Sequence, residues 1–304
     1  MTDAQFTRNS KAGAPAQAKE RKPASFAPNP EPLEVAVYDN HCHLEFVFDE
    51  ELGVMPWPES LDRASSVGVK GIVQVGVTLE SSKWCAEVAT QDDRILAAVA
   101  LHPNEAPLYE NRNKLDDAIA EISSLAAQPR VRAIGETGLD FFRTEGEQSI
   151  DLQQHSFEEH IQIAKENDIA LMIHDRDAHD DVVKTLHRVG APDKVVFHCY
   201  SGDTSLAEIC NANGWYMSFA GNITIKRNHH LRDSLAIADP HLILIETDAP
   251  FLAPEPYRGR PNAPYLVPIT ARAMAQTRNA DLNQLCEQLS RNTETVYGSW
   301  ANHG

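Results

Sequence analysis

Eight short apolar runs, separated by longer amphipathic stretches, make up most of the sequence from residue 35 onward. The runs are VAVYDNHCHL, GIVQVGV, ILAAVALHP, VRAIGETGLD, ALMIHDRDA, KVVFHCYSG, WYMSFAGN and LILIETDAP. Each run is rich in apolar or β-branched residues and ends at a polar or Gly/Pro break, which is typical of buried parallel strands. The stretches between them, such as NKLDDAIAEISSLAAQ, carry apolar residues at helical spacing.

This alternation predicts βαβ units and therefore a parallel sheet. Eight strands over about 260 residues match the usual length of a (β/α)8 TIM barrel, the α/β fold that we predict for residues 34–304. A doubly wound sheet would gather its chemistry at one switch point, whereas ligand-type residues here follow six of the runs. The barrel is therefore the better interpretation.

The first part of the chain, residues 1–33, differs from the rest in composition. It is rich in Ala, Pro, Lys and Asn and has few large apolar side chains, so we expect a disordered tail. The whole chain carries a net charge of −17. That charge argues against a protein that wraps duplex DNA. It leaves a metal-dependent nuclease open, because bound divalent ions reverse the local charge.

Cysteine usage and hydropathy predict a cytoplasmic protein. The five cysteines have no dense spacing, which is typical of reduced thiols. No apolar run approaches the roughly 20 residues of a membrane span, and the first residues lack a secretory signal. We expect neither membrane association nor an obligate protein partner. Cys42 and Cys199 each neighbour a histidine, so strand alternation predicts that both thiols turn towards the outer helices.

Metal-ligating residue types stand at the ends of the runs, where this fold places its active sites. In order they are His41, His43, His102, Glu136, His174, His198 and Asp248. Asp39, His41 and His43 alternate along one run, so all three are expected to face the barrel mouth. An H-x-H pair alone is weak evidence for a metal site. The presence of further ligand-type residues at the other run ends makes coincidence less credible.

Imidazole and carboxylate groups of this kind bind Zn, Mn or Mg. Six of these residues are enough to hold two divalent ions: His41, His43, His174, His198, Glu136 and Asp248. The two oxygens of Glu136 suit a bridging position. Two ions some 3.5–4 Å apart can clamp the attacking and leaving oxygens of a hydrolysis, and one lowers the pKa of bound water towards ~7. The sequence therefore predicts a hydrolase site.

The motifs that carry these residues resemble the TatD family of metal-dependent deoxyribonucleases. They are D-N-H-C-H-L at 39–44, G-E-T-G-L-D at 135–140, H-D-R-D-A at 174–178, H-C-Y-S-G at 198–202 and E-T-D-A-P at 246–250. The order matches as well, and the resemblance runs from about residue 35 to 299. It implies a (β/α)8 hydrolase of the amidohydrolase-like superfamily that binds two divalent ions. It also implies 3′–5′ exonuclease activity on single-stranded DNA, with RNA as a further substrate of some members.

The resemblance also implies roles for single residues. One ion would be bound by His41, His43, Glu136 and Asp248, and the second by Glu136, His174 and His198. The catalytic residues would be Glu136 and Asp248, of which Asp248 would orient or deprotonate the attacking water. The implied substrate-binding residues are His102, Asp140, Arg176 and Arg258. Among them, Arg258 would grip a phosphate oxygen.

Two other functions compete with the nuclease. A small-molecule amidohydrolase or lactonase uses the same barrel, and the fold alone does not decide between the two. That class often bridges its metals with a carbamylated lysine, whereas the fourth run here carries Glu136, which favours the nuclease. A non-catalytic binding barrel is the third hypothesis, and the six intact ligand positions argue against it.

Overall fold

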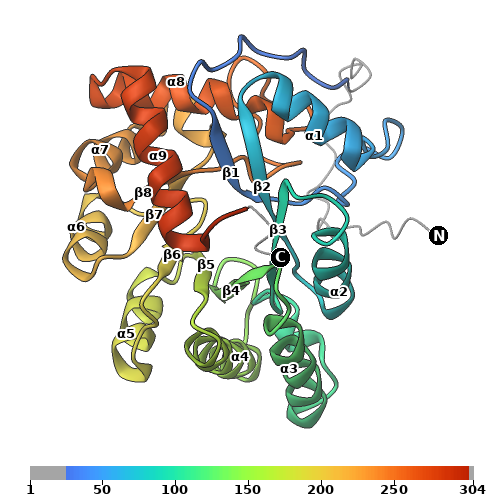
Figure 1. Cartoon of the computed structure of the whole chain (residues 1–304). Helices are drawn as coiled ribbons and strands as arrows, with labels where there is room; N and C mark the ends of the chain where they lie inside the picture. Colours follow the sequence, from blue (N-terminus) through green and yellow to red (C-terminus); the bar gives the residue numbers. More distant parts are fainter. Residues whose placement is uncertain (1–24, 301–304) are drawn as a thin grey trace, which may run out of the picture.

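The computed structural model describes residues 25–300, and its eight strands form one parallel sheet in chain order that curls into a barrel (Figure 1). The strands are β1 (Val37–Cys42), β2 (Val69–Val75), β3 (Ile95–Val99), β4 (Val131–Asp140), β5 (Ala170–Arg176), β6 (Val195–Phe197), β7 (Tyr216–Phe219) and β8 (Ile243–Ile245). Each strand lies within one of the eight apolar runs or overlaps it, and the predicted (β/α)8 barrel is confirmed.

Helices surround the sheet on its outer face (Figure 1). They are α1 (Trp57–Ser66), α2 (Leu79–Val88), α3 (Arg112–Ala126), α4 (Glu147–Glu166), α5 (His179–Val189), α6 (Thr204–Asn213), α7 (His229–Ile237), α8 (Val267–Arg278) and α9 (Leu282–Tyr297). Short 3₁₀ turns cover Ala106–Leu108, Gly221–Thr224, Pro240–Leu242 and Pro264–Leu266. Side chains cap several helix starts: Thr78 accepts from the Ser81 amide, and Asn111 accepts from the Lys114 amide. Within the described residues, no helix combines the length and apolarity needed to cross a bilayer.

Strand β3 shows why the apolar runs are continuous. Its alternate residues Leu96 and Ala98 lie in the cluster that fills the barrel. Ile95, Ala97 and Val99 belong to the larger cluster that includes the outer helices. Because both faces of the sheet are buried, both sets of alternate positions must be apolar.

The barrel closes between β1 and the segment that follows β8. The Asp248 amide donates to the His41 carbonyl at 2.9 Å, and the His43 amide donates to the Ala249 carbonyl at 2.7 Å. Asp39 strengthens this seam, because its carboxylate accepts from the Thr247 amide at 2.8 Å and from the Thr247 hydroxyl at 2.5 Å. Burial raises the pKa of Asp39 to about 8. Asp39 therefore serves barrel closure and lies outside the groups of candidate ligands described below.

Residues 25–33, which we call the N-terminal strap, pack against the barrel. Ala27 and Leu33 are buried. The Ala27 carbonyl accepts from Arg63 and from the Tyr265 hydroxyl, each at 2.8 Å. The expectation of disorder was wrong for these residues. Two buried side chains, Ala27 and Leu33, and hydrogen bonds to the Ala27 carbonyl hold this segment of low overall hydrophobicity against the barrel. The rest of the predicted tail, residues 1–24, lies outside the described residues.

The strap is expected to contribute to stability. Replacing the buried Leu33 with alanine should lower the free energy of unfolding by about 2 kcal/mol, the lower end of the range for buried large-to-small changes. Urea unfolding of both proteins measures this value. Glu31→Ala is the matched control, because Glu31 is exposed in the same segment. Equal midpoints for Leu33→Ala and the wild type would show that the strap adds no stability.

Candidate metal centre

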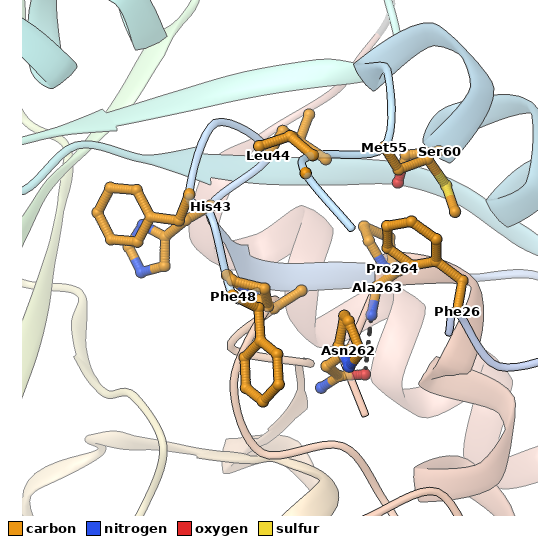
Figure 2. A pocket seen from close by; sticks show the side chains of 15 residues that line it. Phe26, His43, Leu44, Phe48, Met55, Ser60, Asn262, Ala263 and Pro264 are labelled. Atoms are coloured by element: carbon orange, nitrogen blue, oxygen red, sulfur yellow. Dashed lines mark hydrogen bonds between the residues drawn. The ribbon is translucent and has the colours of Figure 1, made fainter. Parts of the chain in front are cut away.

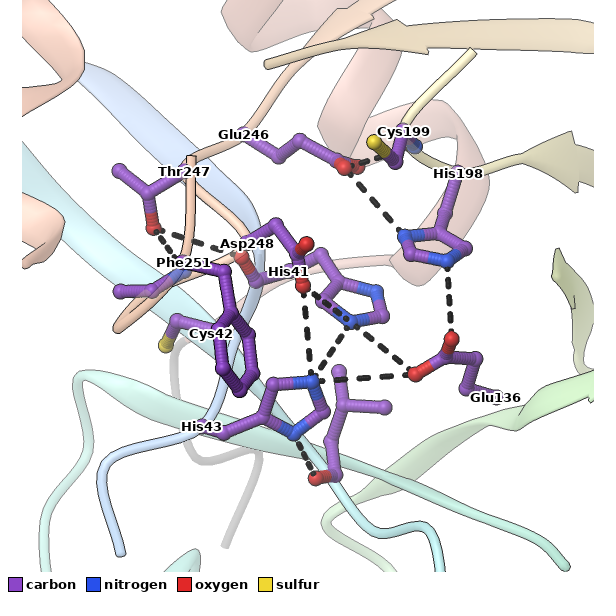
Figure 3. Close-up of polar contacts among 12 residues, drawn as sticks. His41, Cys42, His43, Glu136, His198, Cys199, Glu246, Thr247, Asp248 and Phe251 are labelled. Carbon is purple, nitrogen blue, oxygen red and sulfur yellow. Dashed lines mark hydrogen bonds and ion pairs between the residues drawn. The ribbon is translucent and has the colours of Figure 1, made fainter. Parts of the chain in front are cut away.

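The predicted ligand residues converge at the carboxyl end of the barrel strands. Figure 3 shows five of them turned towards one another: His41, His43, Glu136, His198 and Asp248. Within residues 25–300, three groups of ligand-type atoms lie within 4.8 Å of one another. They are His41, His198 and Asp248; His41, His43 and Glu136; and His102, Glu136 and His174. All seven ligand-type residues that the sequence places at the ends of the apolar runs therefore belong to one cluster.

Two histidines of β1 and the segment after it face two carboxylates. The Nε2 atoms of His41 and His43 lie 3.1 Å apart. Glu136 Oε2 lies 3.6 and 3.8 Å from them, and Asp248 Oδ1 lies 3.6 and 3.7 Å from them. Two imidazole nitrogens and two carboxylate oxygens directed at one point are a suitable donor set for a divalent cation. The side chains present thus fit a metal ion.

Glu136 contacts a second set of histidines through its other oxygen. Glu136 Oε1 lies 2.7 Å from His174 Nδ1, 3.1 Å from His198 Nε2 and 3.2 Å from His102 Nε2. Burial by itself raises the pKa of this carboxyl group. The electrostatic attraction of His102 and His198 has a larger, opposite effect, so the pKa of Glu136 lies well below its ordinary value. The buried side chain is therefore an ionised carboxylate with a separate group of nitrogen donors at each oxygen.

Backbone geometry at β4 explains one glycine of the G-E-T-G-L-D motif. Gly138 has a φ of +137° and lies opposite His174 of β5. A Cβ atom at this position would clash with the His174 carbonyl oxygen. Glycine thus allows β4 to approach β5 closely, next to Glu136 and His174.

Hydrogen bonds also orient the ligand side chains. His43 Nδ1 donates to the Val75 carbonyl at 2.8 Å, which leaves Nε2 as the candidate ligand atom. Asp140 lies 3.2 Å from His174 Nε2 and accepts from the Asn104 side chain at 2.9 Å. These contacts lower the pKa of Asp140 against the opposing effect of burial. The predicted substrate-binding residues His102 and Asp140 thus lie inside the cluster, in contact with candidate ligands.

A cavity of about 540 Å³ opens above the cluster. Glu136, His174, His198 and Asp248 contribute to its lining, as does the predicted substrate-binding residue Arg176 at the end of β5. Arg258 is exposed and is not part of this lining. Instead, Arg143 from the loop after β4 lines the cavity. Sequence reasoning missed Arg143, and only its position three residues after Asp140 was available as a signal.

The two cysteines that neighbour histidines behave differently. Cys42 is fully buried in the cluster beneath the outer helices, as predicted. The prediction for Cys199 was wrong, because this residue lines the cavity. Cys199 lies beyond the end of β6 and has a φ of +42°, so the alternation of an extended strand does not set its direction.

Comparison with known proteins agrees with this geometry. The family model of TatD-related DNases matches residues 38–298. The chain belongs to this TatD family. The uncharacterised metal-dependent hydrolase TatD of Mycobacterium tuberculosis is 37% identical over 263 residues, which cover 86% of this chain and 97% of the relative. The uncharacterised metal-dependent hydrolase YcfH of Escherichia coli K12 is 32% identical, with 85% and 94% covered.

Solved structures of TatD proteins share the fold. The TatD homologue YjjV of Escherichia coli K12 superposes with a TM-score of 0.77 at 27% identity, covering 86% of this chain and 98% of that one. A TatD family hydrolase of Entamoeba histolytica gives a TM-score of 0.76 at 16% identity, with 89% and 100% covered, which supports the fold alone. Family and donor set together identify the chain as a metal-dependent hydrolase of the TatD family with a site for divalent metal.

Glu246 is a buried carboxylate of this TatD site that sequence reasoning missed. Its Oε1 atom lies 3.3 Å from His198 Nδ1 and accepts from the Cys199 amide at 2.7 Å (Figure 3). The Glu246 carboxylate faces the ring nitrogen of His198 that points away from Glu136, which leaves Nε2 as the candidate ligand atom. Strand alternation gave no signal for Glu246, because β8 ends at Ile245 and Asp248 has a φ of +54°.

Removing this contact is expected to weaken metal binding. Glu246→Ala should lower the affinity of the protein for Mn²⁺ or Zn²⁺ by about 10–100-fold, the usual effect of losing an outer-shell partner. Glu246→Gln should stay close to the wild type, because an amide oxygen can accept from both His198 and Cys199. Calorimetric titration of the metal-free proteins measures the effect. Equal losses in both variants would contradict the orienting role.

Proposed function

We propose that this chain is a 3′–5′ exodeoxyribonuclease that uses two divalent ions, Mg, Mn or Zn, to hydrolyse phosphodiester bonds of single-stranded DNA. The observation that carries the proposal is the position of Glu136, whose two oxygens contact separate groups of histidines at the floor of a cavity. Arg143 and Arg176 line the same cavity in a chain whose overall charge is −17. Two cationic groups near a bridging carboxylate suit a phosphodiester substrate.

The ligand roles follow the two sides of Glu136. One ion would be held by His41, His43, Glu136 and Asp248, and the second by Glu136, His174 and His198. His102 lies close enough to the second group to bind there or to contact a phosphate oxygen. When bound, the ions polarise the phosphoryl group and lower the pKa of the attacking water.

Asp248 is the side chain best placed to act on water. It is 14% exposed and lines the cavity, whereas the other carboxylate of the centre, Glu136, is 2% exposed. Asp248 would orient the water and accept its proton as the oxygen attacks phosphorus. The bond from phosphorus to the 3′ oxygen breaks, that oxygen takes a proton from solvent, and a nucleoside 5′-monophosphate leaves.

Degradation of end-labelled oligonucleotides tests this function. Single-stranded DNA with a 3′ or a 5′ label is incubated with Mg²⁺ or Mn²⁺ and, separately, with EDTA. The proposal expects metal-dependent loss of nucleotides from the 3′ end, and RNA and duplex DNA of the same sequence define the preference. If metal-loaded protein cleaves none of these substrates, a small-molecule amidohydrolase or lactonase becomes the better assignment. Amides, lactones and phosphate esters would then be screened.

A further inference from the structure

Both exposed phenylalanines of residues 25–300 lie at the candidate site. The exposed large apolar side chains in this part of the chain are Phe48, Leu108, Phe142 and Ile237. Phe48 is 39% exposed and lines the 540 Å³ cavity. Phe142 lies under Arg176, whose guanidinium carbon is 3.9 Å from the ring centroid, and Arg176 also lines the cavity. Apolar surface left in water beside a site indicates a binding surface.

Phe48 belongs to an apolar wall on one side of the cavity. The apolar wall consists of Phe46, Val47, Phe48, Phe251 and Leu252. Phe46 stacks on His43 with ring centroids 4.5 Å apart, and Phe251 meets Phe46 edge-on at 6.2 Å. These contacts fix the inner part of the wall to a candidate metal ligand. The most exposed ring, Phe48, stands at its rim.

A second, small cavity of about 30 Å³ lies next to the wall. Phe48 lines it together with Phe26 of the N-terminal strap, Asn262 and Ala263 (Figure 2). Phe46 and Phe48 line both cavities. Phe48 is not packed into the hydrophobic core, which leaves its ring available to a ligand in the larger cavity.

The polar lining of the large cavity comes from the opposite side of the barrel. Phe46 to Phe48 follow β1, and Phe251 and Leu252 follow β8, and these two strands are neighbours at the seam. Arg143 follows β4 and Arg176 ends β5, which lie across an eight-stranded barrel from that seam. The cavity therefore has an apolar side, a cationic side and a floor of candidate ligands. A nucleotide has the same division, with its base and its phosphate at opposite ends.

We propose that the apolar wall is a nucleobase subsite, in which the 3′-terminal base stacks on Phe48 while its phosphate faces Arg176 and the ligand cluster. This inference rests on the proposed nuclease function and names the group that the site recognises. Stacking on an aromatic ring accepts every base, because each has a π face. A paired base is already stacked inside a duplex, so the subsite favours unpaired 3′ ends.

Binding of a product nucleotide tests the subsite without requiring hydrolysis. The full chain, loaded with Mg²⁺, is titrated calorimetrically with dTMP and with 1-O-methyl-2-deoxyribose 5-phosphate, which lacks the base. The wild type is expected to bind dTMP roughly 5- to 140-fold more tightly, the range that base–aromatic stacking gives. Phe48→Ala should lose most of this preference, and Phe48→Tyr should keep it. Ile237→Ala is the control, because Ile237 is 43% exposed and outside the cavity.

Oligonucleotides with a normal or an abasic 3′ terminus give a second measurement. Phe48→Ala should raise KM for the normal terminus and leave kcat, and the KM for the abasic one, unchanged. Equal binding of the two small ligands by the wild type would overturn the subsite, and so would a preference that survives Phe48→Ala. If no oligonucleotide is degraded but the dTMP preference depends on Phe48, the nuclease proposal fails and the base subsite stands.

Discussion

Glu136→Ala is expected to abolish turnover and to weaken metal binding at both proposed positions. The wild-type carboxylate contacts His41 and His43 through one oxygen and His102, His174 and His198 through the other. Its removal would leave both groups of nitrogens without their shared anion. The affinity for Mn²⁺ should fall by more than about 100-fold, because loss of a residue that only hydrogen-bonds to a metal ligand already lowers the affinity by about 10–100-fold. Metal content per chain and the rate on single-stranded DNA measure the two effects.

Two controls separate this result from general damage. Glu121→Ala removes an exposed carboxylate that pairs with Lys83 on the outer helices, so it should bind metal and turn over like the wild type. Circular dichroism and thermal unfolding of the metal-free Glu136→Ala protein establish that the barrel still forms. A folded variant that keeps normal metal content and normal rates would refute the bridging position.

Asp248→Asn is expected to separate proton transfer from metal binding. The amide keeps the size of the side chain and one oxygen donor but cannot take a proton from water. We therefore expect kcat to fall by about 10²–10⁴-fold, the usual contribution of a general base. Metal content should fall much less than in Glu136→Ala, since His41, His43 and Glu136 remain. Single-turnover rates at saturating metal measure the effect.

Asp177→Asn is the matched control for this second prediction. Asp177 is an exposed carboxylate just after β5, and its φ of +55° is a conformation that asparagine adopts readily. The Asp177→Asn substitution removes the same charge at the same end of the barrel and leaves the candidate ligands unchanged, so kcat should stay near the wild-type value. An equal loss in both variants would mean that charge at the barrel mouth, and not proton transfer, controls the rate.

Strand periodicity predicted the fold and the ligand cluster because both depend on local pattern and on one rule of the barrel. Residues such as His174 and His198 follow apolar runs, and parallel strand ends meet at one rim. The parts that were missed depend on contacts between distant segments or on loop conformation. The pairing of Glu246 with His198, the packing of Ala27 against Tyr265 and the direction of Cys199 leave no periodic signal.

Arginine placement shows the same limit. Arg176 ends a strand, and its predicted position at the cleft agrees with the cavity lining. Arg258 and Arg143 both lie in loops, where no periodicity fixes side-chain direction. Only Arg143 lines the cavity, and Phe142 beside it holds Arg176 through a stacked contact.

The seam of the barrel has a consequence for the timing of activity during synthesis. Asp39 and Thr247 are 208 residues apart in sequence, yet their contact joins the first strand to the segment that follows the last. Asp248 is held beside His41 at this junction, because its amide donates to the His41 carbonyl. A growing chain therefore carries most of the candidate ligands long before it can assemble them. An ion bound across the junction would also fasten the two ends of the barrel and stabilise the folded state by mass action. Hydrolytic activity is therefore expected only after the segment that carries Asp248 has paired with β1.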